Sequence, residues 1–335
     1  MTMLDTSFRE GKKDMPLIVF VHGLGMDKHI WTDPLRSKVL AGKFPVDILL
    51  RKKARSFITE SKRPMRNRIS LGVAPSRLES LYYKLNKIGF GVLAWSQRRP
   101  AADSGFAVNE LRSLLTDHDE HTRNGIVLLG HSRGGLIAKR FALSEPRPVI
   151  SIISLGSPFM GSSLAKWAKI LAKTSFVLKP FLKSSGQKDV KGNINHVLKF
   201  INSKAVKELL PDSEFIRSLK KPLSSRIKTL SIAGSSPDLI GLYSWHSDCI
   251  KNSKKYRSRQ KLLFSFPNSL NRVLPEMMMP EELIDGKGDG LVAVDSALST
   301  MKGISSIHSL NHAALVFNRS VHQEVISFLK DGVAA

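Results

Sequence analysis

Gly-Ile-Val-Leu-Leu-Gly-His-Ser-Arg-Gly-Gly, residues 125–135, joins an apolar run to a glycine-rich turn around Ser132, and helix-forming residues follow it. This order predicts a strand, a tight turn and a helix, which is the context of a nucleophile elbow. The turn strains the serine backbone, so the residues two positions away must be small, as Gly130 and Gly134 are. The hydroxyl would lie at a helix N-terminus, where free N–H groups favour negative charge. A plain glycine-rich loop would show the same pattern, so other motifs must decide.

A second motif lies near the start of the chain. Leu17–Val21 is an uninterrupted β-forming run of the kind that is buried on both faces of a sheet. It continues into His22, Gly23 and Leu24. An apolar strand followed by His-Gly is where α/β hydrolases place their first oxyanion-hole loop, although an ordinary turn would also fit.

Acyl transfer through serine needs a nucleophile, a base, an acid that orients the base, and donors for the oxyanion. The chain offers Ser132, then Asp289 in the glycine-rich loop 286–292, then His312. The order Ser, Asp, His is that of α/β hydrolases. We therefore predict Ser132, Asp289 and His312 as the catalytic triad. The backbone N–H groups of Leu24 and Arg133 are the predicted oxyanion-hole donors.

Other residues compete for two of these roles. His308 ends a predicted strand four residues before His312, and we favour His312 because a loop after the strand can turn its ring towards Ser132. The acid has alternatives in Asp238, Asp285 and Asp295, and we favour Asp289 because glycines flank it. We expect His22 and His131 to support the site by packing or hydrogen bonding, together with Gly23, Gly130 and Gly134.

Apolar runs alternate with helical patterns along the chain, which predicts an α/β fold with a mostly parallel central sheet flanked by helices. Further strands are expected at 90–95, 148–155, 227–234 and 304–308, and helices at 78–88 (with Ser76 as its cap), 109–115 and 320–330. We place the core in 15–161 and 227–335, with a second insertion near 237–284.

Residues 162–226 interrupt the pattern. Apolar residues recur there at helical spacing with lysines between them, which predicts a helical insertion. The insertion would be a helix packed on the core, a cap over the active site, or an amphipathic surface that meets lipid. The basic run 51–68 is expected to be a solvated loop.

The composition is strongly basic. Lysine and arginine number 52 against 28 acidic residues, which gives a net charge of +24 over 335 residues. Such a charge attracts nucleic acid, acidic lipid surfaces or anionic substrates and does not inform the fold. The single cysteine, Cys249, excludes an intrachain disulfide and fits a reducing compartment. No signal-peptide-like or membrane-spanning apolar run is recognised, so we expect a cytoplasmic protein, with peripheral membrane contact as an alternative.

Taken together, the motifs resemble the bacterial triacylglycerol lipase group of α/β hydrolases. They are residues 21–25 (Val-His-Gly-Leu-Gly), 130–135 (Gly-His-Ser-Arg-Gly-Gly), 155–162 (Leu-Gly-Ser-Pro-Phe-Met-Gly-Ser), 289–292 (Asp-Gly-Leu-Val) and 311–312 (Asn-His). The resemblance implies the α/β-hydrolase fold and assigns the oxyanion, nucleophile, acid and base roles to the residues already named. Ser157 and Phe159 replace the threonine and histidine usual in that group.

Calcium provides one departure from the resemblance. Many lipases of the group bind a structural calcium through an acid two residues after the catalytic histidine, where this chain has Ala314. We therefore expect no metal at that position and no cofactor. The secreted members carry a signal peptide, which is not recognised here, so the resemblance favours the chemistry more than a secreted, lipid-digesting role.

Three functions remain open from the sequence. The first is a serine hydrolase that cleaves carboxylic esters of small molecules or lipids through an acyl-enzyme. The second keeps the triad and changes the reaction to acyl transfer, thioester hydrolysis or amide hydrolysis. The third is a basic protein that binds lipid or nucleic acid on a hydrolase scaffold. The complete triad favours the first, and no specific nucleic acid is expected.

Overall fold

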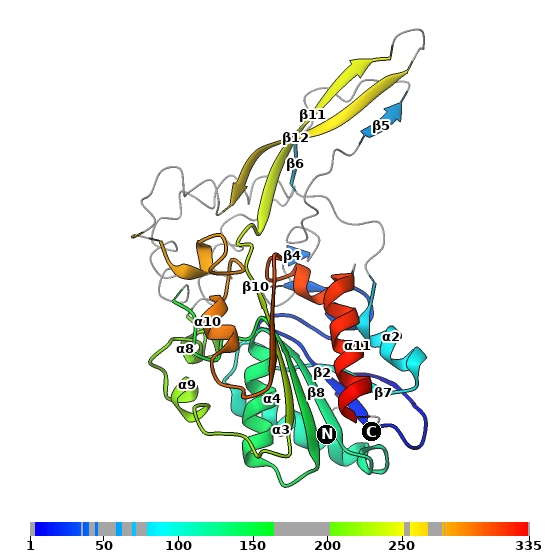
Figure 1. Cartoon of the computed structure of the whole chain (residues 1–335), viewed down its shortest axis with the longest axis vertical. Helices are drawn as coiled ribbons and strands as arrows, with labels where there is room; N and C mark the ends of the chain where they lie inside the picture. Colours follow the sequence, from blue (N-terminus) through cyan, green and yellow to red (C-terminus); the bar gives the residue numbers. More distant parts are fainter. Residues whose placement is uncertain are drawn as a thin grey trace.

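The computed structural model describes residues 4–34, 36–39, 44–45, 58–61, 69–71, 79–163, 202–250, 255–266, 277 and 279–333. Its main feature is a seven-stranded sheet (Figure 1). In sheet order the strands are β1 (Asp5–Arg9), β7 (Gly91–Ser96), β2 (Leu17–Val21), β8 (Ile126–His131), β9 (Val149–Leu155), β10 (Lys228–Gly234) and β13 (Ile304–His308). Every neighbouring pair is parallel except β1 and β7, which confirms the predicted α/β fold with a mostly parallel central sheet.

Helices cover both faces of this sheet. They are α1 (His29–Thr32), α2 (Leu81–Ile88), α3 (Ser104–Asp117), α4 (Arg133–Ser144), α8 (Lys204–Glu208), α9 (Glu214–Ser218), α10 (Val294–Leu298) and α11 (Arg319–Val333). Short 3-10 helices lie at η2 (Asp119–Thr122), η5 (Glu281–Leu283) and η6 (Ala314–Val316).

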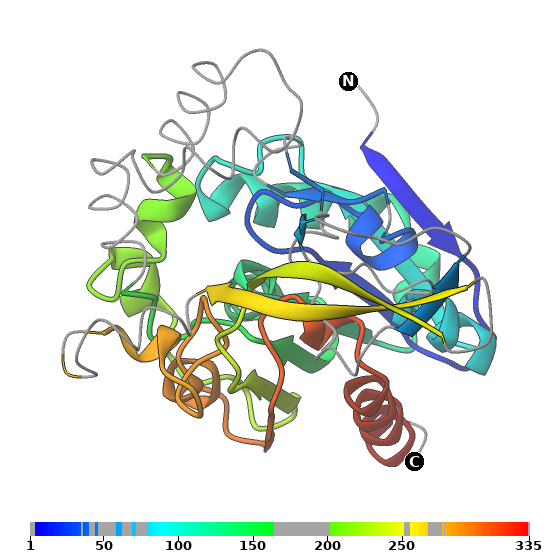
Figure 2. The ribbon, with the colours of Figure 1, turned by 90° about the horizontal axis from the view of Figure 1, so that it is seen from above.

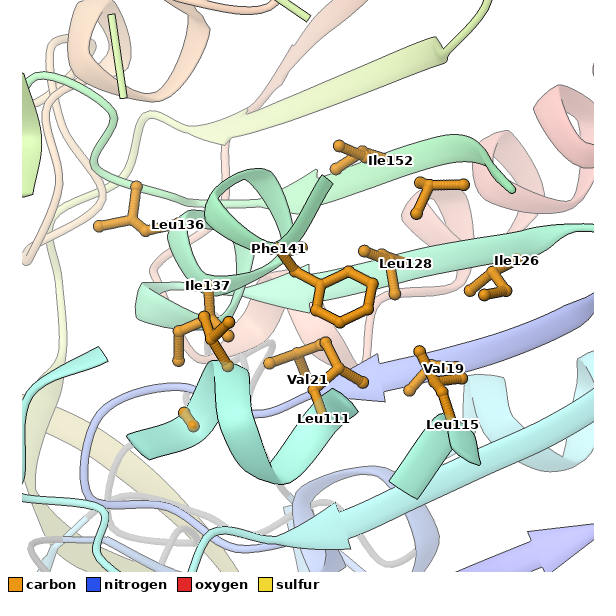
Figure 3. Close-up of a cluster of buried hydrophobic side chains, with 14 of the residues drawn as sticks. Val19, Val21, Leu111, Leu115, Ile126, Leu128, Leu136, Ile137, Phe141 and Ile152 are labelled. Atoms are coloured by element: carbon orange, nitrogen blue, oxygen red, sulfur yellow. The ribbon is translucent and has the colours of Figure 1, made fainter. Parts of the chain in front are cut away.

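The alternation of side chains along β2 builds the two halves of the core. Ile18 and Phe20 pack in a buried cluster with residues of α1, α2 and α11. Leu17, Val19 and Val21 pack in a second cluster with residues of α3, α4 and α9. Successive side chains of a strand point to opposite faces, so a run that is apolar at every position indicates burial on both sides. Figure 3 shows part of the second cluster, with Phe141 of α4 facing Val19 and Leu128.

A separate four-stranded antiparallel sheet lies outside this core. Its order is β5 (Ile58–Ser61), β12 (Tyr256–Phe266), β11 (Ile240–Cys249) and β6 (Ile69–Leu71). Figure 1 shows it extending away from the main sheet beyond β10, and Figure 2 shows the yellow β11–β12 hairpin from above, crossing in front of the core. The run 51–68, expected to be a loop, therefore contains β5. A two-stranded sheet joins β3 (Lys38–Val39) to β4 (Phe44–Pro45).

Local differences from the sequence-based expectations have simple causes. β1 was not predicted because its strand, at an edge of the sheet, is largely polar and only partly buried. Helix α2 begins at Leu81 and its cap is Ser80, whose hydroxyl accepts from the Tyr83 N–H at 3.5 Å. Ser76, the expected cap, lies outside the described residues. Two serines four residues apart can both precede a helical pattern, and the sequence does not separate them.

The predicted insertion 162–226 is described at its two ends. α8 and α9 lie in its second half and are short helices capped by Ser203 and Ser213. Residues 164–201 lie outside the described part of the chain, so the proposed domain boundaries remain a prediction. Within the described residues, no helix combines the length and the apolar character that crossing a bilayer requires.

Candidate active site

Ser132 lies in the tight turn between β8 and α4 with φ 55° and ψ −128°. It is the one non-glycine with positive φ among the described residues. The turn is held by backbone hydrogen bonds from the Ser132 N–H to the Leu155 carbonyl at 2.9 Å and from the Gly135 N–H to the Ser132 carbonyl at 3.1 Å. A side chain at positive φ is strained, and such strain is found preferentially at functional sites.

The glycines around Ser132 allow this turn to pack against its neighbours. A Cβ atom on Gly130 would lie 2.3 Å from the Gly135 nitrogen, and one on Gly134 would lie 2.1 Å from the Val21 carbonyl oxygen. Both distances are far inside van der Waals contact with backbone, which cannot move aside as a side chain can. The requirement for small residues therefore comes from close backbone approach.

Asp289 and His312 form a buried pair next to this turn. The Asp289 Oδ2 and His312 Nδ1 atoms are 2.8 Å apart, and both residues are almost completely inaccessible to solvent. The other carboxylate oxygen, Oδ1, accepts from the N–H groups of Leu291 and Val292 at 3.0 and 2.7 Å. The His312 N–H also donates to the Asp289 carbonyl at 2.9 Å, so backbone and side chain fix the pair together.

This pairing determines what the imidazole can do. Because the carboxylate accepts at Nδ1, that nitrogen carries the proton and Nε2 has a free lone pair. Within the described part of the chain, His312 Nε2 is buried and has no hydrogen-bond partner. A free lone pair on an imidazole held by a carboxylate is the arrangement of a general base.

The competing residues lie elsewhere. His308 Nε2 is 2.8 Å from Glu324 Oε2, so this histidine is bound to helix α11. Asp285 and Asp295 are exposed, and Asp238 contributes its backbone carbonyl to the Asn311 side-chain amide at 2.8 Å. Of the four candidate acids, the one whose carboxylate is hydrogen-bonded to His312 is Asp289.

His131 precedes the serine and packs against His312, with ring centroids 4.6 Å apart. Its Nε2–H donates to the His312 carbonyl at 3.0 Å. Burial, with a further contribution from His312, holds the pKa of His131 well below its usual value. A neutral ring at this position places no positive charge beside the His312 imidazole.

His22 fixes the loop that approaches Ser132 from β2. Its Nδ1–H donates to the Gly23 carbonyl at 2.9 Å and its Nε2 accepts from the Gln97 N–H at 3.0 Å. Burial lowers the pKa of His22 to about 4. A Cβ atom on Gly23 would lie 3.0 Å from the Ser132 Cβ, so the loop that carries Leu24 packs directly on the serine.

Arg133 follows the serine as the first residue of α4, where a backbone N–H has no partner within the helix. Its side chain is buried and turned into the protein. The Nη2 group donates to the Ala102 carbonyl at 2.8 Å and to Glu208 Oε2 at 3.0 Å. Burial lowers the pKa of Arg133 and Glu208 opposes this, so the guanidinium keeps its charge.

Glu208 is the residue at this site that the sequence did not reveal. It lies in the insertion, 75 residues from Arg133, and nothing in its local pattern indicates a contact with the elbow. The only signal available is an arginine beside the candidate nucleophile, which would need an acid if it were buried.

Comparison with known proteins places the chain in a family. Residues 18–187 match the model of the alpha/beta hydrolase family, a span that includes the Leu24 loop and Ser132 and ends before Asp289 and His312. A search of curated protein sequences found no match.

Solved structures of lipases are similar to this chain. A Bacillus licheniformis lipase in its propeptide form has 15% identity and a TM-score of 0.51, covering 97% of this chain and 53% of that chain. The mature lipase has 15% identity, a TM-score of 0.48 and coverage of 98% and 96%. A Paleococcus ferrophilus monoacylglycerol lipase has 16% identity, a TM-score of 0.44 and coverage of 99% of both chains.

The family match covers β2 (from Ile18), β7, β8 and β9 of the main sheet, together with the Leu24 loop and the Ser132 turn. The chain belongs to the alpha/beta hydrolase family.

Proposed function

We propose that the chain is a serine hydrolase that cleaves carboxylic esters through an acyl-enzyme, with Ser132, Asp289 and His312 as its triad. The observation that carries the proposal is the buried Asp289–His312 pair, which leaves His312 Nε2 without a hydrogen-bond partner among the described residues. In the same structure, Ser132 occupies a strained turn at positive φ, as a nucleophile elbow requires. Membership of the alpha/beta hydrolase family supports a small-molecule ester substrate, and a lipid acyl chain is the finer part of the proposal.

In the first half of the reaction, Ser132 Oγ attacks the ester carbonyl carbon while His312 Nε2 takes the hydroxyl proton. The Asp289 carboxylate holds the imidazolium that forms. The carbonyl oxygen becomes an oxyanion and accepts from the backbone N–H groups of Leu24 and Arg133. The C–O bond to the alcohol then breaks, and the leaving oxygen takes the proton from His312.

In the second half, a water molecule gives a proton to His312 Nε2 and attacks the acyl carbon. The tetrahedral intermediate collapses, Ser132 Oγ leaves and recovers the proton, and the carboxylic acid is released. The same groups would serve an alcohol, thioester or amide reaction. Product analysis with water and with alcohol or amine acceptors separates ester hydrolysis from those alternatives.

The direct test is Ser132→Ala. Wild type is expected to take up one fluorophosphonate group, seen in the intact mass, and to hydrolyse p-nitrophenyl esters. Ser132→Ala should take up none and lose about 10⁴-fold or more in kcat, because the covalent route disappears. Turnover that survives in a folded Ser132→Ala variant would contradict the assignment. A panel of rising acyl length would then define the acyl-chain preference.

We also propose a peripheral contact with an anionic membrane surface. The net charge is +24, and β12 carries Arg257, Arg259 and Lys261 in a sheet outside the hydrolase core. Lysine and arginine near an anionic leaflet each contribute about 1 kcal/mol of binding. Co-sedimentation with phosphatidylserine vesicles, expected at low salt and lost at high salt, tests this contact. Equal binding to neutral phosphatidylcholine vesicles would contradict it.

A further inference from the structure

We propose that helix α8 positions the oxyanion hole, with Glu208 as its principal positioning residue; this inference rests on the proposed function. Leu24 and Arg133, the two residues whose N–H groups would bind the oxyanion, come from segments more than 100 residues apart in sequence. α8 contacts both of them, through Val206 and through Glu208.

The Glu208 contact acts on the elbow. Its Oε2 accepts from Arg133 Nη2 at 3.0 Å, and both carboxylate oxygens accept from the Ser104 N–H at 2.9 Å. The Ser104 hydroxyl donates to Oε1 at 3.0 Å. The carboxylate therefore joins α8 to the first residue of α3 and the first residue of α4, where N–H groups lack partners within their helices.

Burial makes the Glu208–Arg133 contact strong. The Arg133 side chain is 1% exposed and that of Glu208 is 17% exposed. Removing one partner of a buried ion pair leaves a charge without compensation, which is strongly destabilising and drives the remaining charge towards water. If the Arg133 guanidinium moved towards water, it would pull on the Arg133 backbone, whose N–H is the proposed oxyanion donor.

The second contact acts on the other donor. Val206 is buried and packs against Leu24 and Ala101. The Ala205 N–H donates to the Ala101 carbonyl at 3.3 Å, which fixes α8 along the segment that precedes α3. One short helix thus supports both sides of the hole. Because α8 begins directly after the central part of the insertion, the insertion is joined to the catalytic donors through Val206 and Glu208.

Oxyanion positioning predicts a specific kinetic defect. A misplaced donor weakens binding of the transition state more than binding of the ester, so kcat falls while KM changes little. Complete removal of one donor costs about 10²–10³ in kcat, so partial displacement should cost about tenfold. Sulfur accepts hydrogen bonds less well than oxygen. When a donor is displaced, kcat should therefore fall less for a thionoester, which has sulfur in place of the carbonyl oxygen, than for the matching oxoester.

The experiment compares kcat and KM of wild type, Glu208→Ala and Glu208→Gln on a matched aryl oxoester and thionoester. Glu208→Ala should lower kcat for the oxoester about tenfold, keep KM within about twofold, and lower the oxoester-to-thionoester ratio of kcat/KM. Glu208→Gln keeps an oxygen acceptor for Ser104 and removes the charge, so it should fall between Glu208→Ala and wild type. It also serves as the folded variant if Glu208→Ala does not fold.

Glu145 provides the matched control at the other end of α4. Its side chain is 9% exposed and pairs with Arg112 at 2.8 Å and Arg147 at 3.6 Å. Glu145→Ala should lower thermal stability and keep the wild-type oxoester-to-thionoester ratio. The same unchanged ratio in both Glu208 variants would overturn the inference and leave Glu208 as a structural brace. Wild type without fluorophosphonate uptake or turnover would instead contradict the proposed function and, with it, this inference.

Discussion

The region around Ser132 and the four-stranded sheet β5–β12–β11–β6 differ in how closely backbone surrounds each residue. Around Ser132, an added Cβ atom on Gly130 or Gly134 would overlap main-chain atoms. In the small sheet, Asp248 and Arg257 lie opposite each other across the ladder and are exposed. Single substitutions should therefore be severe in the first region and mild in the second, and their effects should separate catalysis from surface binding.

The largest effect is expected from Gly134→Ala. The new Cβ would lie 2.1 Å from the Val21 carbonyl oxygen, so α4 must move away from β2 and carry Ser132 with it. Overpacking of this kind costs about 3 kcal/mol or more of the free energy of unfolding. The free energy of unfolding, measured by denaturant titration, and the uptake of fluorophosphonate by the same sample should both fall.

Gly332→Ala is the control for this substitution. Among the described residues, its Cβ would meet only the Lys228 side chain, at 3.4 Å, and alanine is the better helix former in α11. The free energy of unfolding should equal that of wild type or exceed it by up to about 1 kcal/mol, and fluorophosphonate uptake should be complete. A Gly134→Ala variant that unfolds and labels like wild type would show that the elbow is not as constrained as its backbone contacts indicate.

The next effect concerns buried histidines and pH. Burial lowers the pKa of both His22 and His322 from 6.5 to about 4. Between these values the unfolded chain binds protons that the folded chain excludes, so the free energy of unfolding falls as pH falls from 6.5 to 4. Each histidine contributes about 3 kcal/mol to this loss, which is complete below pH 4.

His322→Gln tests the magnitude at a position away from Ser132. The His322 Nε2–H donates to the Val316 carbonyl at 2.7 Å, and a glutamine amide can keep that bond. Denaturant unfolding at pH 7 and at pH 4.5 should show a smaller difference in the variant than in wild type. An equal difference in both proteins would mean that His322 does not exclude a proton in the folded state.

The contrast between the two regions also explains what the sequence could predict. β2 and the first part of β8, Ile126 to Leu129, were predicted because every position there is apolar, which occurs when helices cover both faces of a parallel sheet. Ser132, Asp289 and His312 could be proposed because glycine-flanked turns after such strands and their chain order leave a local signal. The structure adds the contact between Asp289 and His312, and the catalytic roles stay predictions.

The elements that were missed depend on distant partners. β5 and β6 are short strands in a basic stretch and take their form from pairing with β12 and β11, about 170–200 residues later. β1 is an edge strand whose polar residues show no apolar run. Glu208 acquires its role only when folding brings α8 to the start of α4. Contacts of this range leave no periodicity for a local pattern to report.

The smallest effect on catalysis is expected from the double substitution Arg259→Gln and Lys261→Gln in β12. These positions belong to the sheet outside the core, so kcat/KM for a water-soluble p-nitrophenyl ester should stay within about twofold and stability within about 0.5 kcal/mol per site. Partition onto phosphatidylserine vesicles should weaken about tenfold or more, because two cations are lost from the sequence of β12.

Lys12→Gln and Lys330→Gln remove the same charge from two exposed positions away from the small sheet, and this double variant is the control for total charge. If both double variants weaken vesicle binding equally, attraction depends on the net charge of +24 and the small sheet has no special part in it. If only the β12 variant loses binding while both keep ester turnover, surface binding lies in the small sheet and catalysis lies at the Ser132 turn. The two regions would then be separable in function as well as in their tolerance of substitution.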